Sequence, residues 1–178
     1  MKPDYKNWAP RGLLFLLGGM AIICLALCAV FGMAGVATEG GLRIALGVLF
    51  GAAFLLFAVL TGIFANMYCA FSYNGKRKIS KRVIEGIAKY VTLPDGGRGL
   101  DVGCGSGALT IACAKRNSRA QMVGIDRWGK EYASFNLPLC ERNAEAEGVK
   151  NVSFARGNAV KLDFPDEMFD AVTSNYVY

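Results

Sequence analysis

The organisation of this chain is clearest in ten residues, Gly99-Leu-Asp-Val-Gly-Cys-Gly-Ser-Gly-Ala108. An apolar run that carries one acidic residue, Asp101, leads into three closely spaced glycines. Glycines after a strand let the backbone turn tightly and let a ligand approach without interference from a Cβ atom. If a helix begins directly afterwards, its free amide groups face that ligand. The stretch therefore predicts a strand, a ligand-binding turn and a helix. A carboxylate beside the turn would repel a pyrophosphate but attract a cationic, amino-bearing ligand.

Alternating strand and helix patterns surround this turn. Such alternation predicts an α/β fold, a Rossmann-like parallel sheet with helices on both faces, of which the sequence supplies the first four strands. Pro138 lies inside one helical pattern, where a proline costs about 3 kcal/mol, so we expect a kink or break there. The expected helices span residues 79–91, 108–115 and 130–148, and the expected strands span 98–102, 121–125, 152–155 and 171–173.

The first part of the chain has a different character. Residues 12–38 and 44–75 contain no charged side chain, and each run exceeds the roughly 20 residues needed to cross a bilayer as a helix. The connection around Glu39–Arg43 is so short that the two helices should be antiparallel neighbours. We therefore predict an all-α transmembrane hairpin within residues 1–75, with spans at about 12–37 and 44–68. The alternatives are a cleaved signal peptide, for the first span, and a helix pair buried in a protein core.

The cations flanking the two spans predict their orientation. The loop between the spans offers only Arg43, whereas both outer ends are basic, so the positive-inside rule places both termini and the α/β segment in the cytoplasm of a multi-pass membrane protein. The basic run after Gly75 could also contact anionic headgroups of the lipid bilayer. The outer cations are Lys2, Lys6, Arg11, Lys76, Arg77, Lys78, Lys81 and Arg82.

Composition excludes several kinds of chemistry. The 178 residues carry a net charge of +6 and include no histidine. A Ser-His-Asp triad, a Cys-His dyad and a histidine-bearing zinc site therefore cannot be built. The six cysteines include no CxxC pair, and we interpret all of them as small buried apolar residues. No metal site is predicted.

With these residues the chain resembles the class I S-adenosylmethionine-dependent methyltransferases. Residues 100–107 match the family's first motif: hydrophobic, acidic, hydrophobic, Gly-x-Gly-x-Gly. Asp126 matches the acidic residue that ends the second strand and holds the ribose hydroxyls. Gly157-Asn-Ala159 resembles the turn that contacts the adenine edge, although the family more often has Asp at position 158. Residues 162–172 match the version of the fourth motif seen in small-molecule methyltransferases.

The resemblance implies S-adenosyl-L-methionine as cofactor and an enzyme that methylates an unidentified small-molecule or lipid-like acceptor. Residues 76–178 would form the cofactor-binding, N-terminal part of the methyltransferase domain. We expect residues 1–178 to be inactive on their own. No nucleic acid partner is expected, because Asn175 and Tyr176 do not open an Asn-Pro-Pro-Tyr signature. These two are candidates for the substrate side, and no catalytic base is identifiable. The implied cofactor-binding residues are Asp101, Gly103, Cys104, Gly105, Gly107, Asp126, Arg127, Asn158 and Ala159.

Two other functions remain open at this point. The glycine run also satisfies the G-x-G-x-x-A pattern of dinucleotide-binding domains, and Asp126 lies near the spacing of their ribose-binding acid, so an NAD(P)-binding oxidoreductase is one alternative. The other is a non-catalytic, membrane-bound cofactor-binding or scaffold protein. Asp101 and the later acidic segment favour the methyltransferase.

Overall fold

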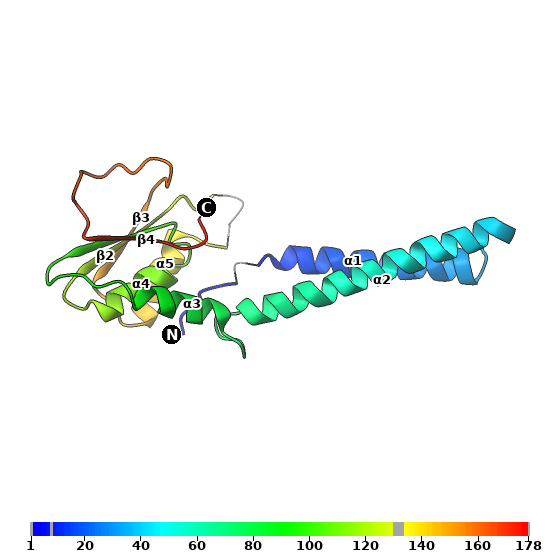
Figure 1. The fold of residues 1–178 in the computed structure, drawn as a ribbon, viewed down its shortest axis with the longest axis horizontal. Coiled ribbons are helices and arrows are strands. Elements are labelled where there is room, and N and C mark those ends of the chain that lie inside the picture. The colour runs from blue at the N-terminus through cyan, green and yellow to red at the C-terminus, as the bar shows by residue number, and fades with distance from the viewer. Residues whose placement is uncertain (1, 8, 130–133, 178) are drawn as a thin grey trace. The chain divides into compact units, whose positions relative to one another are not determined.

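The computed structural model describes residues 2–7, 9–129 and 134–177, and the chain forms two compact units (Figure 1). The hairpin comprises Asn7–Arg77. The α/β unit comprises Lys78–Tyr178 together with Met1–Lys6. The first six residues thus pack with the α/β unit, whereas the sequence suggested a single boundary near residue 75.

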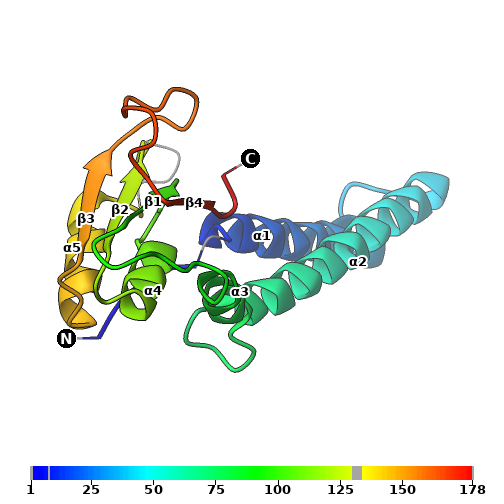
Figure 2. The ribbon, with the colours of Figure 1, turned by 60° about the vertical axis from the view of Figure 1, so that its left-hand side comes forward.

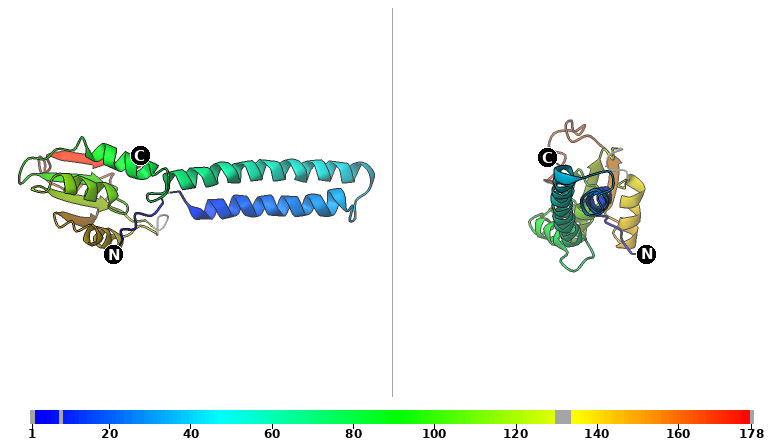
Figure 3. Two further views of the ribbon diagram at one scale, coloured as in Figure 1. Left: turned by 90° about the horizontal axis from the view of Figure 1, so that it is seen from below. Right: turned by 90° about the vertical axis from the view of Figure 1, so that its right-hand side faces the viewer.

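The hairpin consists of two long apolar helices. Helix α1, Arg11–Leu27, continues as a π-helical turn, η1, Cys28–Met33, and α2 spans Gly40–Phe71. The helices run side by side in opposite directions (Figure 3). By length and composition both could cross a membrane, and almost none of their residues is buried within the protein.

The turn of the hairpin is closed by polar side chains. The Arg43 guanidinium donates from Nε to the Gly32 carbonyl at 2.9 Å and from Nη2 to the Met33 carbonyl. The Thr38 hydroxyl donates to the carbonyl of Phe31 at 2.7 Å. The last carbonyls of a helix have no partner within the helix, so these contacts satisfy groups that an apolar surrounding would leave unpaired.

The α/β unit contains the predicted parallel sheet. Its order is β3-β2-β1-β4, and every neighbouring pair is parallel (Figure 2). Val102 is aligned with Ile125 on one side and with Ser174 on the other, so the carboxyl ends of three strands meet at one edge. The strands are β1, Arg98–Val102; β2, Gln121–Asp126; β3, Val152–Arg156; and β4, Ala171–Ser174.

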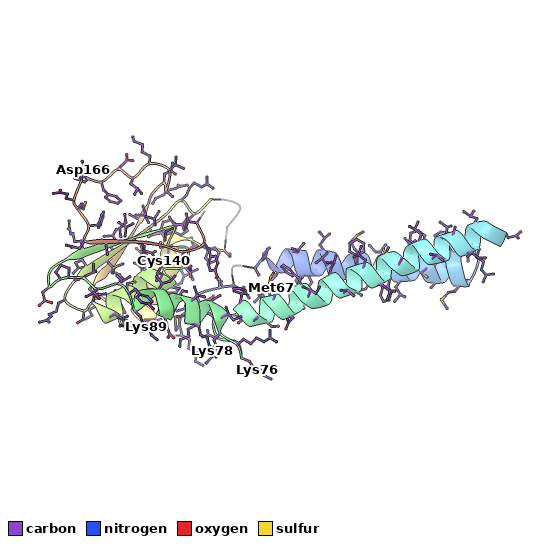
Figure 4. All side chains as sticks on the ribbon, viewed as in Figure 1. Met67, Lys76, Lys78, Lys89, Cys140 and Asp166 are labelled. Carbon is purple, nitrogen blue, oxygen red and sulfur yellow. The ribbon has the colours of Figure 1, made fainter. Side chains whose placement is uncertain are left out.

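The two faces of the sheet are covered differently. Helix α4, Ala108–Arg116, contacts β1, β2 and β3, and it also contacts α3, Ile79–Ala88, and α5, Leu137–Ala146. Leu100, Val102 and Ile125 form a buried apolar cluster on the sheet. Phe164 and Phe169, from the segment between β3 and β4, pack against this cluster. In the described residues this segment forms no helix, in agreement with the sequence, which predicts none between residues 155 and 171. It contains Pro165 and a series of acidic residues, and Figure 4 shows Asp166 on the part that stands away from the sheet.

The helix predicted over residues 130–148 is shorter in the structure. It begins at Leu137, where the Asn136 side chain accepts a hydrogen bond from the Leu139 amide at 2.9 Å. Pro138 therefore lies in the first turn, where its missing N–H would have had no partner within the helix. Residues 134–136 are not helical, and residues 130–133 lie outside the described part of the chain.

Candidate functional site

The glycine-rich loop, residues 103–107, connects β1 to α4 at the carboxyl edge of the sheet. Gly103, Gly105 and Gly107 adopt φ values of 74°, 56° and 80°, a region that side-chain-bearing residues rarely occupy. The amides of Gly103 and Cys104 both donate to the Ile125 carbonyl, at 2.7 and 3.0 Å. The loop is thereby held against the end of β2.

Asp126, the last residue of β2, contacts the loop directly. Its Oδ2 accepts a hydrogen bond from the Gly105 amide at 2.8 Å, and its Oδ1 accepts one from the Trp128 amide at 2.7 Å. Parallel pairing places the ends of β1 and β2 at the same edge, so two groups separated by 21 positions meet. The structure thus brings together the two predicted site elements that the sequence separates.

The three glycines of the loop have different surroundings. A Cβ atom on Gly105 would find only Phe135 Cδ1 within 4 Å, at 3.9 Å, so this position faces open space. A Cβ on Gly107 would lie 2.9 Å from the Phe154 ring, and one on Gly103 would collide with the Val177 side chain. The backbone at position 105 is therefore open, whereas the absence of a Cβ atom at the other two glycines allows close packing.

Asp101 lies beneath the loop and is only 1% exposed. Its Oδ2 accepts a hydrogen bond from the Thr110 hydroxyl at 2.6 Å, and its Oδ1 accepts one from Thr173 at 3.1 Å. Burial raises the pKa of Asp101 from 3.8 to about 6, although the two hydroxyls oppose that shift. The buried carboxyl can therefore change its charge within a biologically accessible pH range.

The turn after β3 lies next to the end of β2. The Gly157 amide donates to the Asp126 carbonyl at 3.0 Å. Asn158 is exposed, and its Oδ1 accepts a hydrogen bond from the Val160 amide at 3.0 Å, which closes a local turn. Ala159 packs against the cluster around Leu100, whereas the Arg127 side chain is exposed.

The residues after β4 reach the same edge of the sheet. Asn175 is half-buried, and Tyr176 is 62% exposed with a φ of 61°. Val177 follows and packs against Gly103. The two candidates for the substrate side are therefore close in sequence to a direct contact with the glycine-rich loop.

Trp128 and Cys140 contact the loop although the sequence analysis did not identify them. Trp128 Nε1 donates to the Gly105 carbonyl at 2.9 Å, and Cys140 Sγ contacts the same oxygen at 3.2 Å. Trp128 follows Asp126 by two positions, but nothing in the local pattern assigns it a role. Cys140 comes from α5, and only the tertiary fold brings it to the loop.

The cysteines of the α/β unit, Cys104, Cys113 and Cys140, are free and buried. A hydrogen bond with Cys140 and burial raise the pKa of Cys104, and burial raises the pKa of Cys113 to about 12. The prediction that all six cysteines are buried is wrong for two residues of the hairpin. Cys28 is half-buried and Cys69 is exposed. An apolar side chain on a membrane-type helix can face lipid and needs no cover from protein.

Comparison with known proteins agrees with this geometry. Residues 93–178 match the family model described as "Methyltransferase domain". The demethylmenaquinone methyltransferase of Geobacillus stearothermophilus is 32% identical over 90 residues, which are 51% of this chain and 37% of the relative. The 2-phytyl-1,4-naphtoquinone methyltransferase of Synechococcus elongatus is 32% identical over 122 residues, 68% of this chain and 49% of the relative.

The crystal structure of the YcgJ protein from Bacillus subtilis is 29% identical, with a TM-score of 0.45, and the match covers 54% of this chain and 38% of that one. The chain spans between about a third and a half of the length of these curated relatives. The match to the family model begins at Leu93, just before β1, and includes the glycine-rich loop, Asp126 and all four strands. Residues 93–178 therefore belong to the class I S-adenosylmethionine-dependent methyltransferases.

Proposed function

We propose that the complete protein is a membrane-anchored methyltransferase that uses S-adenosylmethionine to methylate an apolar, quinone-type acceptor. The observation that carries the proposal is the hydrogen bond from the Gly105 amide to Asp126 Oδ2. It joins the loop after β1 to the acidic end of β2, the two places where a ligand with an amino-acid part and a ribose part needs contacts.

The groups at this edge fit the cofactor. Asp126 accepts one backbone hydrogen bond on each oxygen, and each oxygen keeps a further lone pair for a ribose hydroxyl. The open side of Gly105 leaves room for a ligand close to the backbone. Among the described residues no buried side-chain nitrogen or oxygen lacks a partner, so the fit rests on these acceptors and on this open space.

Asp101 contributes through its charge. The carboxyl is almost fully buried, and both of its oxygens are held by threonine hydroxyls, so it acts on a ligand from beneath the loop. A negative charge in this position stabilises a nearby ammonium or sulfonium group, because opposite charges attract strongly where little water is present. The same charge would repel the anionic pyrophosphate of a dinucleotide.

Methyl transfer requires the protein mainly to position the cofactor and the acceptor. When bound, S-adenosylmethionine supplies the methyl group on a sulfonium that is already a good leaving group. The protein has to hold the acceptor atom in line with that methyl group and exclude water. We assign the nucleoside to Asp126 and Asn158, and the acceptor to the side of Asn175 and Tyr176, which follow β4 at the same edge.

The acceptor class is inferred from two observations. The relatives of known name act, by those names, on demethylmenaquinone and on a phytyl-naphthoquinone. The hairpin carries large exposed apolar side chains along both helices, including Phe15, Ile22 and Ile44. A domain tied to such a hairpin would meet acceptors that dissolve in the bilayer, which favours a naphthoquinone over a water-soluble compound.

The proposed topology of the anchor is supported by the residues that make up the α/β unit. Residues 1–6 precede the hairpin and pack in the same unit as residues 78–178, which follow it. This packing supports a topology in which both ends of the hairpin lie on one side of the membrane. The cations at both outer ends support the cytoplasmic side.

The proposal is tested by methyl transfer in membranes. Membranes that contain the complete protein are incubated with cofactor radiolabelled in the methyl group and with a reduced naphthoquinone, and the lipids are extracted. We expect label in the quinone fraction and its loss in the Asp126→Ala variant. Tight cofactor binding without transfer to any extractable acceptor would instead favour a non-catalytic scaffold.

A further inference from the structure

The N-terminal strap, residues 4–6, is fixed to the α/β unit ahead of the first apolar helix. The Asp4 amide donates to Asn143 Oδ1 at 2.7 Å, and Asn143 Nδ2 donates to the Asp4 carbonyl at 3.0 Å. The Tyr5 ring is buried, and its hydroxyl donates to Glu147 Oε1 at 3.2 Å. The first residues of a domain are usually poorly ordered unless tied down, so this attachment is specific.

The strap is hydrogen-bonded to the glycine-rich loop at Ser106. The Ser106 hydroxyl is buried and donates to the Tyr5 carbonyl at 3.1 Å. Asn143 Nδ2 also donates to the Ser106 carbonyl, at 2.9 Å. Ser106 lies between Gly105, whose amide bonds Asp126, and Gly107, which begins the turn into α4. The loop is thus held on one side by Asp126 and on the other by Asn143 and the strap.

Asn143 is completely satisfied only when the strap is in place. The side chain is 2% exposed; its oxygen accepts from Asp4, and its amino group donates to Asp4 and to Ser106. Without the strap, the Asn143 oxygen, one of its N–H groups and the Ser106 hydroxyl would all lose their protein partners. Buried polar groups without partners are costly, so the loop would move to satisfy them.

We propose that Asn143 and the N-terminal strap are positioning elements that hold the glycine-rich loop in its cofactor-binding conformation. The proposal rests on the function proposed above. It ties the start of the membrane hairpin to the cofactor site, because only residues 7–10 separate the strap from α1. A protein whose strap is displaced would keep its fold and its membrane helices but would bind the cofactor weakly.

The coupling must act in both directions. If docking of the strap strengthens cofactor binding by a given factor, then bound cofactor strengthens docking of the strap by the same factor. Lys6 is exposed and ends the strap, so trypsin cleavage after Lys6 reports on its release. Saturation with the cofactor should therefore slow this cleavage.

The test uses the full chain in detergent micelles, with S-adenosylhomocysteine as the ligand in calorimetry. Tyr5→Ala and Asn143→Ala should each weaken binding by about tenfold, which corresponds to the loss of one or two net hydrogen bonds. The double variant should be little worse than either single variant, because both changes release the same strap. Saturating S-adenosylhomocysteine should slow cleavage after Lys6 in the unmodified protein by a similar factor.

Asn151→Ala is the matched control. Asn151 Nδ2 also donates to backbone carbonyls, those of Ala114, Asn117 and Ala120, but none of these belongs to the loop or the strap. This variant should lower the melting temperature and leave the affinity within about twofold, since distant sites act independently.

The outcomes separate the two proposals. If the unmodified protein binds no S-adenosylhomocysteine, the proposed function fails, and the strap proposal fails with it. If the unmodified protein binds the ligand and the strap variants bind it equally well, only the strap proposal is overturned. Equal losses of affinity in Asn143→Ala and Asn151→Ala would also overturn it, because they would reflect general destabilisation.

Discussion

The hairpin and the α/β unit differ in where they place their apolar side chains: the hairpin exposes them, and the α/β unit buries them. In the α/β unit Leu100, Ile111 and Met122 are each 1% exposed. In the hairpin Phe15 is 75% exposed and Ile44 is 69% exposed. An exposed apolar surface of this extent is unfavourable in water and would be neutral in lipid, which supports the proposal that the hairpin lies in a bilayer.

Their polar groups differ in the same way. The hairpin uses its few polar side chains to close its own turn, as Arg43 does, and packs its helices through glycines. The α/β unit buries Asp101, Thr110 and Asn143 next to one loop. Buried polar groups cost free energy unless they are paired, so their concentration around residues 103–107 indicates that this loop needs a fixed conformation. This difference supports the proposed roles of the two units, a membrane anchor for the hairpin and cofactor binding for the α/β unit.

The largest contrast between the two units should appear in chemical labelling. In a cysteine-free background, Gly41→Cys lies at the turn of the hairpin with no atom near its Cβ, and Asp166→Cys lies on an exposed segment of the α/β unit. An impermeant thiol reagent added outside intact cells should label Gly41→Cys nearly completely and Asp166→Cys hardly at all. Labelling of Asp166→Cys at full rate in intact cells would invert the topology.

Within the α/β unit, Asp126→Ala should have the largest effect on ligand binding. The change removes the acceptor for the Gly105 and Trp128 amides together with the proposed ribose contact. Loss of hydrogen bonds to a charged group costs about 1.5–3 kcal/mol, or about 10- to 150-fold in affinity. Calorimetry with S-adenosylhomocysteine measures it. Asp163→Ala is the control and should bind normally, because Asp163 is an exposed carboxylate that pairs with Lys161.

Asp101→Asn should separate stability from binding. Because the pKa of Asp101 in the fold is about 6 and its ordinary value is 3.8, the folded protein holds the extra proton between these pH values. Stability therefore falls as pH rises through this window, and the neutral variant should be more stable by up to about 3 kcal/mol above pH 6. Near pH 4 the difference should vanish. Denaturant titration of the α/β unit within the full chain measures both.

The same substitution should weaken binding of the cationic cofactor. A cation near the loop favours the ionised carboxylate, so the unmodified protein should bind S-adenosylmethionine more weakly below pH 6, whereas Asp101→Asn should show no such pH dependence. The effect should be smaller for S-adenosylhomocysteine, which lacks the sulfonium charge. A pH profile shared by both proteins would show that Asp101 does not act on the ligand.

The smallest effect is expected in the hairpin. A Cβ on Gly32 would lie 2.6 Å from the Gly47 Cα, so Gly32→Ala should force the helices apart at a cost of about 1–2 kcal/mol. Gly19 has no atom within 4 Å of its Cβ position, so Gly19→Ala is the matched control. The amount of sodium dodecyl sulfate that separates the helices should fall for the first variant only. Cofactor affinity should stay unchanged in both.

Much of the fold could be predicted because local patterns determine it. The strand over residues 98–102 and the glycine-rich loop appear where the sequence predicts them, since a short apolar run that leads into closely spaced glycines is typical of a buried strand followed by a tight turn. The length of the uncharged runs likewise predicts the two long helices. The helix over 130–148 was extended too far, because a helical pattern does not reveal that Asn136 caps a shorter helix ahead of Pro138.

Residues of the candidate site could be predicted only where they belong to a local sequence motif. Asp101 and Asp126 stand out by their position at strand ends, whereas Trp128, Cys140 and Asn143 reach the loop by tertiary contacts that no local pattern encodes. The attachment of residues 4–6 to α5 joins positions 139 apart in the chain. The burial of Asp101 was also not visible, because a carboxylate in a strand is usually exposed unless it is paired.

The central claim is that the carboxyl edge of this sheet binds S-adenosylmethionine and not a dinucleotide. The most direct measurement is calorimetry of the purified full-length protein in detergent, with S-adenosylhomocysteine and NADH titrated separately into the unmodified protein and into Asp126→Ala. The account predicts binding of S-adenosylhomocysteine that the substitution weakens by about 10- to 150-fold, and no binding of NADH. Binding of NADH without binding of S-adenosylhomocysteine would contradict it.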